Sequence, residues 1–404
     1  MVSSIAPGLF IIGYIIGTGS VTSMAKSGAD YGMSLFWALA LSCFCTYVLV
    51  VAISRVTIVS GHTIVYCIRR RFGSALAILI IVGLMATVVT SVMGVMGIAA
   101  DVAREWSGQL LGREVPPLAS AIFFNALLLF LFWSGSHRLF LKAMSVIVAM
   151  MSLSFIGAAV MVTSSPGELL VSLKPAWPAG GDAHLVLAAM VGTTMASVCV
   201  VTRSYLVAEH GWTVKDLAAE NRDAIISLSL TLLVSGAIMA CATGTMRSAG
   251  ITVEQAIDMV KTLEPLAGPY ATGVFVIGIV AAALSSLFPN YLLGPWVVCD
   301  YRNVQRDMQR PVVRLAVAAV ASLAFVVPIF GGRPVLIMIV SQAISPVIMP
   351  LLIVFMLILL NDKTLNSEYK TPIALNVGLL IALSFSLLAS YSAVLGLIAT
   401  VRGM

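Results

Sequence analysis

The chain has few charged and few aromatic side chains. Of its 404 residues only 10% are charged and 8% are aromatic, whereas 60% are hydrophobic and the mean hydropathy is +1.05. Soluble domains carry about 25% charged residues, so this composition excludes a soluble globular protein and indicates an integral membrane protein. The apolar stretches are long and continuous, which favours membrane-spanning helices over the alternating strands of a β-barrel.

The sequence also lacks the signatures of several kinds of chemistry. The six cysteines lie in or beside apolar segments, and none has the spacing of a zinc finger or of a disulfide framework. A Gly-x4-Gly-Lys loop for nucleotide phosphates is missing, and so is any polar stretch long enough for a soluble domain. We therefore expect no enzyme, no cofactor, no nucleic-acid partner and no obligate protein partner. The evident partner is the lipid bilayer.

Eleven apolar segments are predicted to cross the membrane, and together they make the chain, 1–404, a single transmembrane domain. They lie at about 5–24, 31–58, 72–103, 118–133, 138–163, 183–206, 222–247, 267–295, 311–331, 334–361 and 372–398. With the N-terminus in the cytoplasm, 15 of the 23 Lys and Arg residues fall on the inner side and 8 on the outer side. This asymmetry follows the positive-inside rule and predicts a multi-pass protein of the cell membrane with an extracellular C-terminus.

Small and hydroxylated residues interrupt the first and the sixth of these segments at their centres. Residues 17–20 read Gly-Thr-Gly-Ser, and residues 192–197 read Gly-Thr-Thr-Met-Ala-Ser. Helices in hydrocarbon normally keep every backbone polar group hydrogen-bonded within the helix. Such clusters therefore indicate places where the backbone hydrogen bonds of the helix are interrupted. A pair of opened segments, one in each half of a chain, points to the substrate site of a transporter. We predict a carrier in which the two breaks face each other.

The five-span separation of the two breaks predicts an inverted repeat. An odd number of helices per repeat turns the second copy over relative to the first. The predicted repeats are about 5–163 and 183–361, and the helix at 372–398 is added to them.

Motifs along nearly the whole chain resemble the Nramp family of divalent-metal transporters. Residues 6–10 (Ala-Pro-Gly-Leu-Phe) are similar to the family's Gly-Pro-Gly-Phe-Leu at the start of the first helix, and the family's Asp-Pro-Gly-Asn signature then falls on residues 17–20. Residues 191–198 fall on the sixth-helix pattern Val-Gly-Ala-Thr-Val-Met-Pro-His. Further similarities lie at 263–269, 282–286, 341–342 and 350. The resemblance implies an all-α LeuT-type fold of eleven transmembrane helices with helices 1 and 6 broken.

The departures from this family pattern fall on its metal-binding positions. Gly17, Thr18 and Ser20 stand where the family has Asp, Pro and Asn, and Ala196 stands at the sixth-helix Met. The carboxylate and the thioether of the family's site are therefore both replaced. The chain resembles most closely a related subgroup, the Nramp-related magnesium transporters, which is described by substitutions of this kind.

These replacements favour a hard cation. Thioethers select softer transition metals, whereas oxygen ligands suit magnesium, which keeps several of its waters. A wide, uncharged, oxygen-lined pocket would accept a hydrated magnesium ion. The candidate contacts are the carbonyls near Gly17 and Thr193, the hydroxyls of Thr18, Ser20 and Ser197, the space at Ala196 and the amide of Gln342. Each of these small residues could instead serve helix packing, but the two clusters together favour an ion site.

Titratable groups are scarce where the resemblance would place a proton pathway. The family's third-helix Asp and Glu fall on Ser91 and Gly94, and all four histidines lie in or next to predicted loops. We therefore expect no titratable group near the middle of the membrane, and transport uncoupled from protons. Arg203, near one end of its segment, is expected to extend to the cytoplasmic interface, or alternatively to form a gating pair with Glu209 or Asp300.

The sequence thus predicts a facilitative magnesium carrier that also accepts manganese and works by alternating access. Two alternatives stay open. A proton-coupled manganese or iron carrier of the Nramp type would be favoured by a buried acid near the breaks. A carrier of a small organic solute on the same fold would be favoured by a large pocket lined with aromatic side chains.

Overall fold

In the computed structural model the described residues are 17–134, 137–162, 172–177, 182–304, 310–362 and 370–403, and their regular structure is entirely helical. The helices are α2 (Thr18–Tyr31), α3 (Phe36–Ser60), α4 (Ile64–Phe72), α5 (Ser74–Leu111), α6 (Pro117–Ser134), α7 (His137–Val162), α9 (Ala183–Thr194), α10 (Ser197–His210), α11 (Leu217–Ala242), α12 (Glu264–Ala267), α13 (Ala271–Arg302), α14 (Pro311–Ser322), α15 (Val326–Phe330), α16 (Pro334–Asn361) and α17 (Ile373–Gly403). Short 3-10 or π-helical turns join or extend several of them.

Ten stretches of the described chain are long and apolar enough to cross a membrane. They match the predicted segments from the second to the eleventh. Most of the first segment, 5–16, lies outside the described residues, so the count of eleven stays a prediction. Its predicted end near residue 24 is wrong, because α2 continues to Tyr31 and ends at Gly32, whose φ of +61° favours glycine.

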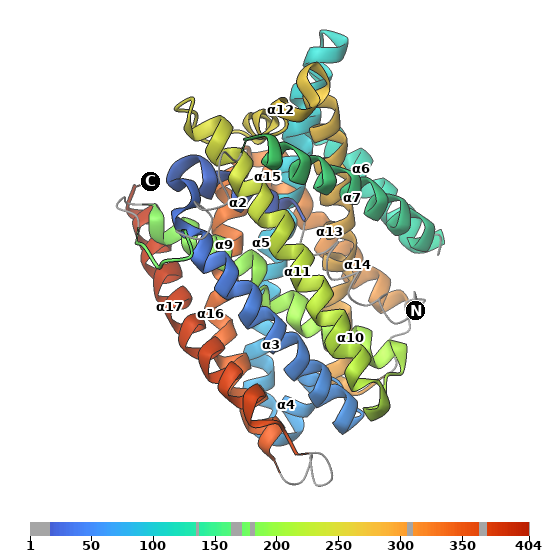
Figure 1. The fold of residues 1–404 in the computed structure, drawn as a ribbon. Coiled ribbons are helices and arrows are strands. Elements are labelled where there is room, and N and C mark those ends of the chain that lie inside the picture. The colour runs from blue at the N-terminus through green and yellow to red at the C-terminus, as the bar shows by residue number, and fades with distance from the viewer. Residues whose placement is uncertain are drawn as a thin grey trace.

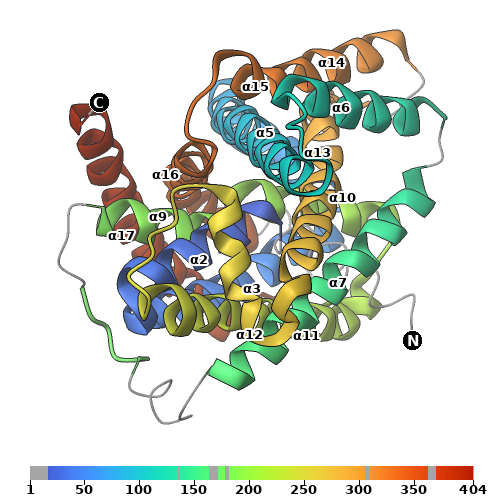
Figure 2. The same cartoon turned by 90° about the horizontal axis from the view of Figure 1, so that it is seen from above.

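The helices form a bundle in which α9 and α10 are the most deeply buried and α16 is only partly buried. Helix α16 packs against α5, α9 and α17, while α2 packs against α9 and α11. Seen from above, α6 and α14 lie at one edge of the bundle and α17 at another (Figure 2). The α4 end and the α12 end form the two opposite ends of the long axis (Figure 1).

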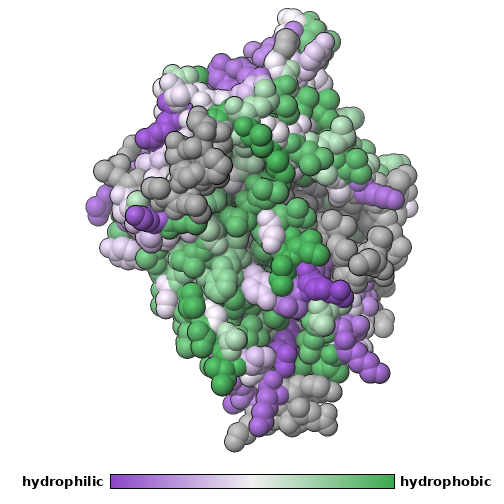
Figure 3. Space-filling model, in the orientation of Figure 1, coloured by the Kyte–Doolittle hydropathy of each residue, from purple (hydrophilic) through white to green (hydrophobic). Residues whose placement is uncertain are grey.

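The sides of the bundle are apolar. Hydrophobic residues cover much of the middle of the face shown in Figure 3, and hydrophilic residues gather toward its two ends. Large exposed apolar side chains include Phe123 and Phe130 on α6, Val160 on α7 and Leu315 on α14. A patch of this extent is unfavourable in water but suits contact with lipid.

Candidate functional site

The predicted break in the sixth segment is confirmed, and it is shorter than expected. Helix α9 ends at Thr194 and α10 begins at Ser197, so only Met195 and Ala196 leave the helical conformation, with ψ of 41° and 118°. Gly192 and Thr193 stay helical. The last turn of α9 is closed by a hydrogen bond from the Met195 N–H to the Val191 carbonyl, at 2.7 Å.

Side chains from two other helices bind the backbone groups that this break exposes. The Thr46 hydroxyl on α3 donates to the Thr194 carbonyl at 3.1 Å. The Ser345 hydroxyl on α16 accepts from the Ser197 N–H at 3.0 Å. Backbone groups inside a bilayer are costly without partners, so these two contacts stabilise the opened conformation. The Thr193 carbonyl receives no hydrogen bond from the described residues, and it remains available at the end of α9.

The residue cluster 17–20 lies beside the residue cluster 192–197. Helix α2 begins at Thr18, and the extended Gly17 before it accepts the first helical bond, from the Val21 N–H at 3.2 Å. The part of the first predicted break before Gly17 lies outside the described residues. Within α2, the Ser20 hydroxyl is 3.0 Å from the Thr193 hydroxyl on α9. The two clusters thus meet, but the prediction that residues 18–20 are opened is wrong because they belong to α2, and the break before α2 stays a prediction.

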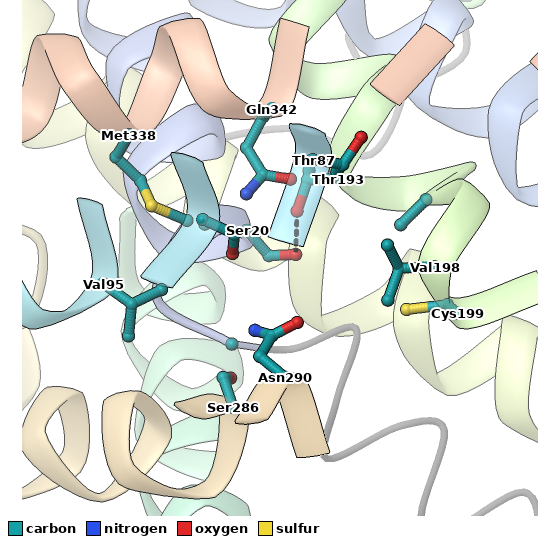
Figure 4. Close-up of a pocket in the computed structure, with 14 residues that line it drawn as sticks. Ser20, Thr87, Val95, Thr193, Val198, Cys199, Ser286, Asn290, Met338 and Gln342 are labelled. Atoms are coloured by element: carbon teal, nitrogen blue, oxygen red, sulfur yellow. Dashed lines mark hydrogen bonds between the residues drawn. The ribbon is translucent and has the colours of Figure 1, made fainter. Parts of the chain in front are cut away.

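A polar cavity lies where these helices meet (Figure 4). Its wall is formed by Gly17, Gly19, Ser20, Thr87, Ser91, Val95, Thr193, Ala196, Val198, Cys199, Ser286, Asn290, Met338 and Gln342. The space open to the centres of water molecules is about 40 Å³, which holds about three waters at roughly 10–15 Å³ each. The cavity is thus smaller than the wide pocket that the sequence predicted.

Five of the seven predicted contact residues belong to this wall: Gly17, Ser20, Thr193, Ala196 and Gln342. The other two do not line the cavity. Thr18 is fully buried beside it. The Ser197 hydroxyl lies 3.3 Å from the Ser345 hydroxyl, on the side of α10 that faces α16.

Sequence reasoning missed the contributions of α5 and α13 to the wall. Thr87 and Ser91 come from α5, and Ser286 and Asn290 come from α13. Each is a polar side chain inside a long apolar segment. This was the signal in the sequence that could have identified them as candidate residues of the site. The Ser286 hydroxyl is buried and forms no hydrogen bond with the other described residues, so its oxygen is available for a contact in the cavity.

The electrostatics of the cavity come from dipoles. The described residues of its wall include no Asp, Glu, His, Lys or Arg. The carbonyl end of α9 presents a partial negative charge, whereas α2 and α10 present their N–H ends at the breaks. The negative end of α9 and the positive ends of α2 and α10 partly cancel. The net electric field in the cavity is therefore weaker than the field of a carboxylate.

One helical turn beyond Cys199, a basic side chain of α10 is buried against two acidic side chains of α11. This finding corrects two expectations. Arg203 on α10 is fully buried and does not extend to the interface; it donates to Asp223 at 2.6 Å and to Glu220 at 3.2 Å. Its partners are thus on α11, not Glu209 or Asp300. The expectation of no titratable group near the middle of the membrane stays a prediction. Because α11 begins at Leu217, Glu220 and Asp223 lie on one helix face toward α10.

A helix that is broken between α9 and α10 beside a polar cavity, within a bundle of apolar helices, is typical of a multi-pass membrane transporter. The chain matches the family Nramp (natural resistance-associated macrophage protein-like) over residues 8–396. It belongs to the Nramp family.

Known proteins similar to this chain agree with that assignment. A divalent metal cation transporter MntH from Verminephrobacter eiseniae (strain EF01-2) is 22% identical over 367 residues, which cover 89% of this chain and 81% of the relative. The crystal structure of the Eremococcus coleocola manganese transporter superposes with a TM-score of 0.74 at 16% identity and covers 97% of this chain and 86% of that chain. Mhp1, a nucleobase-cation-symport-1 family transporter, superposes with a TM-score of 0.56 at 15% identity, and the match covers 98% of this chain and 91% of that chain. The fold is of the LeuT type.

Proposed function

We propose that this protein is a divalent metal-ion transporter that takes up Mg²⁺ by alternating access, accepts Mn²⁺ as well, and does not couple transport to protons. The observation that carries the proposal is the uncharged, oxygen-rich cavity at the contact between Ser20 and Thr193. The printed names of the relatives, a divalent metal cation transporter and a manganese transporter, support the class of substrate.

The size of the cavity suggests how the ion is held. Magnesium demands six oxygen ligands at about 2.0–2.1 Å and usually keeps several waters. A cavity with room for about three waters can supply the remaining ligands from the hydroxyls and amides of its wall. Ala196 leaves the space on the α10 side that a longer side chain would fill. The ion therefore enters partly hydrated, bound by water and by neutral oxygens.

The driving force for uptake is the membrane potential together with the ion gradient. We infer a cytoplasmic N-terminus from the excess of basic residues at the α4 end, where Arg69, Arg70 and Arg71 close that helix. A dication that moves inward across 100 mV gains about 4.6 kcal/mol, at about 2.3 kcal/mol per charge. Uptake needs no proton gradient.

Uptake into proteoliposomes tests the proposal. We expect Mg²⁺ and Mn²⁺ to enter while a pH-sensitive dye inside reports no acidification, and an imposed pH gradient should leave the rate unchanged. Acidification of the lumen in proportion to metal uptake would refute the uncoupled mechanism. Failure of every divalent cation to enter would refute the transport proposal itself.

A matched pair of threonine variants ties the uptake to this cavity. Thr193→Val removes a cavity hydroxyl with little change of shape, and we expect uptake to fall about tenfold, the lower end of the effect of lost support around a metal. Thr231→Val makes the same change at a buried position of α11 outside the wall, and uptake should stay within about twofold of the wild type. Equal rates in the two variants would place the ion elsewhere.

One observation favours a second candidate, proton-coupled manganese transport. The buried carboxyls of Glu220 and Asp223 contact a single guanidinium one turn from the cavity. The acidification assay separates the two candidates directly. A carrier of organic solutes is not supported, because the described part of the wall has no aromatic side chain and about 40 Å³ is far below the roughly 300–1,000 Å³ of small-molecule pockets.

A further inference from the structure

A methionine on α16 brings a sulfur atom to the cavity from the side opposite to the break in the sixth segment. Met338 belongs to the wall, and its side chain points from α16 toward Ser20 (Figure 4). Gln342, another wall residue, lies one turn further along the same helix. The expectation that the site is left with oxygen ligands and space therefore overlooked a thioether.

Two glycines make room for this side chain. A Cβ atom at Gly19 would lie 2.7 Å from the Met338 methyl carbon and 2.7 Å from the Gln342 amide nitrogen. A Cβ atom at Gly94 on α5 would lie 3.0 Å from the Met338 sulfur. The thioether is thus held between α2 and α5, beside the Ser20 hydroxyl and the Gln342 amide. A side chain at either glycine would have to displace it.

Buried methionines usually serve to fill gaps in an apolar core, but the surroundings of Met338 differ from such a core. Seven of the other residues of the wall carry hydroxyl or amide groups: Ser20, Thr87, Ser91, Thr193, Ser286, Asn290 and Gln342. A thioether is neutral, needs no deprotonation and binds soft cations more tightly than hard ones. Placed among hard oxygens, it gives the wall one soft donor.

We propose that the Met338 thioether is a direct ligand of soft divalent cations in this cavity, and that it enables a site built mainly of oxygens for Mg²⁺ to bind Mn²⁺ as well and Cd²⁺ more tightly. Ser20, Thr193 and Gln342 supply the oxygen ligands. This inference rests on the proposed function in placing the ion in the cavity, and it adds that the selectivity comes from α16. The break between α9 and α10 contributes space at Ala196.

The test is a binding measurement that does not depend on transport. Cys199 is the other sulfur of the wall, so the comparison is made in a Cys199→Ser background. Isothermal titration with CdCl₂ and MgCl₂ gives the ratio of the two affinities for C199S and for C199S/M338L. Leucine keeps the volume of methionine without the sulfur. We expect the ratio of Cd²⁺ to Mg²⁺ affinity to fall about tenfold in C199S/M338L, as for loss of a contact near a metal.

A second methionine on the same helix provides the control. Met349 is fully buried on α16 and does not line the cavity, so C199S/M349L should keep the ratio of C199S. An unchanged ratio in C199S/M338L, with folding verified by thermal unfolding, would overturn the inference. A lowered ratio in a protein that takes up no cation into liposomes would support Met338 as a ligand while refuting transport, so the two failures are distinguishable.

Discussion

Gly192 lies where α9 passes closest to α16. A Cβ atom at this position would be 1.9 Å from the Gln342 carbonyl oxygen, which belongs to the backbone of α16 and has little freedom to move. The absence of a side chain thus brings the two helices together beside the cavity. In a membrane, where helix association depends on close packing, such an approach is a principal source of stability.

Gly192→Ala is expected to destabilise the protein by about 1–3 kcal/mol, because overpacking of a tight contact forces the backbone apart. Thermal unfolding in detergent measures the loss. Gly273→Ala is the matched control, since a Cβ atom there meets no heavy atom within 4 Å. An unfolding temperature for G192A equal to that of G273A would contradict the assigned role of this glycine.

Gly17 provides a test of the charge of the site. Gly17→Asp restores a carboxylate to the wall of the cavity, and a carboxylate near a dication adds a large local attraction. We expect Mn²⁺ binding, measured by titration calorimetry, to tighten about tenfold, in the range that single groups near a metal contribute. The same substitution at Gly273, outside the wall, should leave Mn²⁺ binding unchanged. Equal Mn²⁺ affinities in the wild type and G17D would remove Gly17 from the site.

Single residues were predictable from the sequence only where a local pattern marked them. Ser20 and Thr193 stood out because they interrupt apolar segments, and the structure brings them into contact. Met338 could not be recognised, because a methionine in an apolar helix looks like any core residue until the helices are packed. Thr18 and Ser197 shared the pattern of their neighbours, but the helical turn carries their side chains to other faces.

Among the elements, α10 and α11 are joined by ionic contacts inside the protein. Arg203 reaches both carboxylates of α11, donates through its Nε to the Ser54 hydroxyl of α3 at 3.2 Å and lies 5.3 Å from the ring centre of Trp212. All three charged side chains are at most 1% exposed. Removal of one of these three charges lowers the stability of the protein strongly, because the charges that remain stay buried without their partner.

Arg203→Met is therefore expected to lower the free energy of unfolding by about 3–5 kcal/mol. Thermal or denaturant unfolding in detergent measures the change. Lys261→Met is the control, since the Lys261–Glu264 pair is 3.6 Å apart and about half exposed, and such a pair contributes at most about 1 kcal/mol.

Should R203M fail to fold, the triple variant R203M/E220Q/D223N separates two causes. One is the burial of carboxylates without their arginine, and the other is the loss of the packing of the arginine side chain. It removes all three charges, so much of the stability should return. A triple variant as unstable as R203M would show that Arg203 acts through its packing.

The elements themselves were largely predictable from the sequence, because apolar runs of membrane length admit few structures. The break between α9 and α10 was located within a few residues from its small side chains. The buried salt bridges of Arg203 with Glu220 and Asp223 were not predicted, since the expected start of the seventh segment at 222 left Glu220 in a loop. The start of α11 at Leu217 brings that residue into the bundle.

At the scale of the whole molecule, uncharged polar groups occupy the centre and charges gather toward the ends. The part of the cavity wall that the structure describes carries no charged side chain, while the α4 end carries three consecutive arginines. This distribution limits how tightly a dication is held halfway through the membrane, and a weakly held ion is released quickly. A site of this kind suits a carrier for an ion that is abundant outside.

The contact between the Ser20 and Thr193 hydroxyls has a further consequence. One of these two groups must point its hydrogen at the other, and a nearby cation repels that hydrogen while attracting the oxygen lone pairs. An ion that drew on both oxygens would therefore turn both hydrogens away from the ion and replace the hydrogen bond by two metal–oxygen contacts. Loading would exchange one link between α2 and α9 for another, so the two helices would stay joined with the ion and without it.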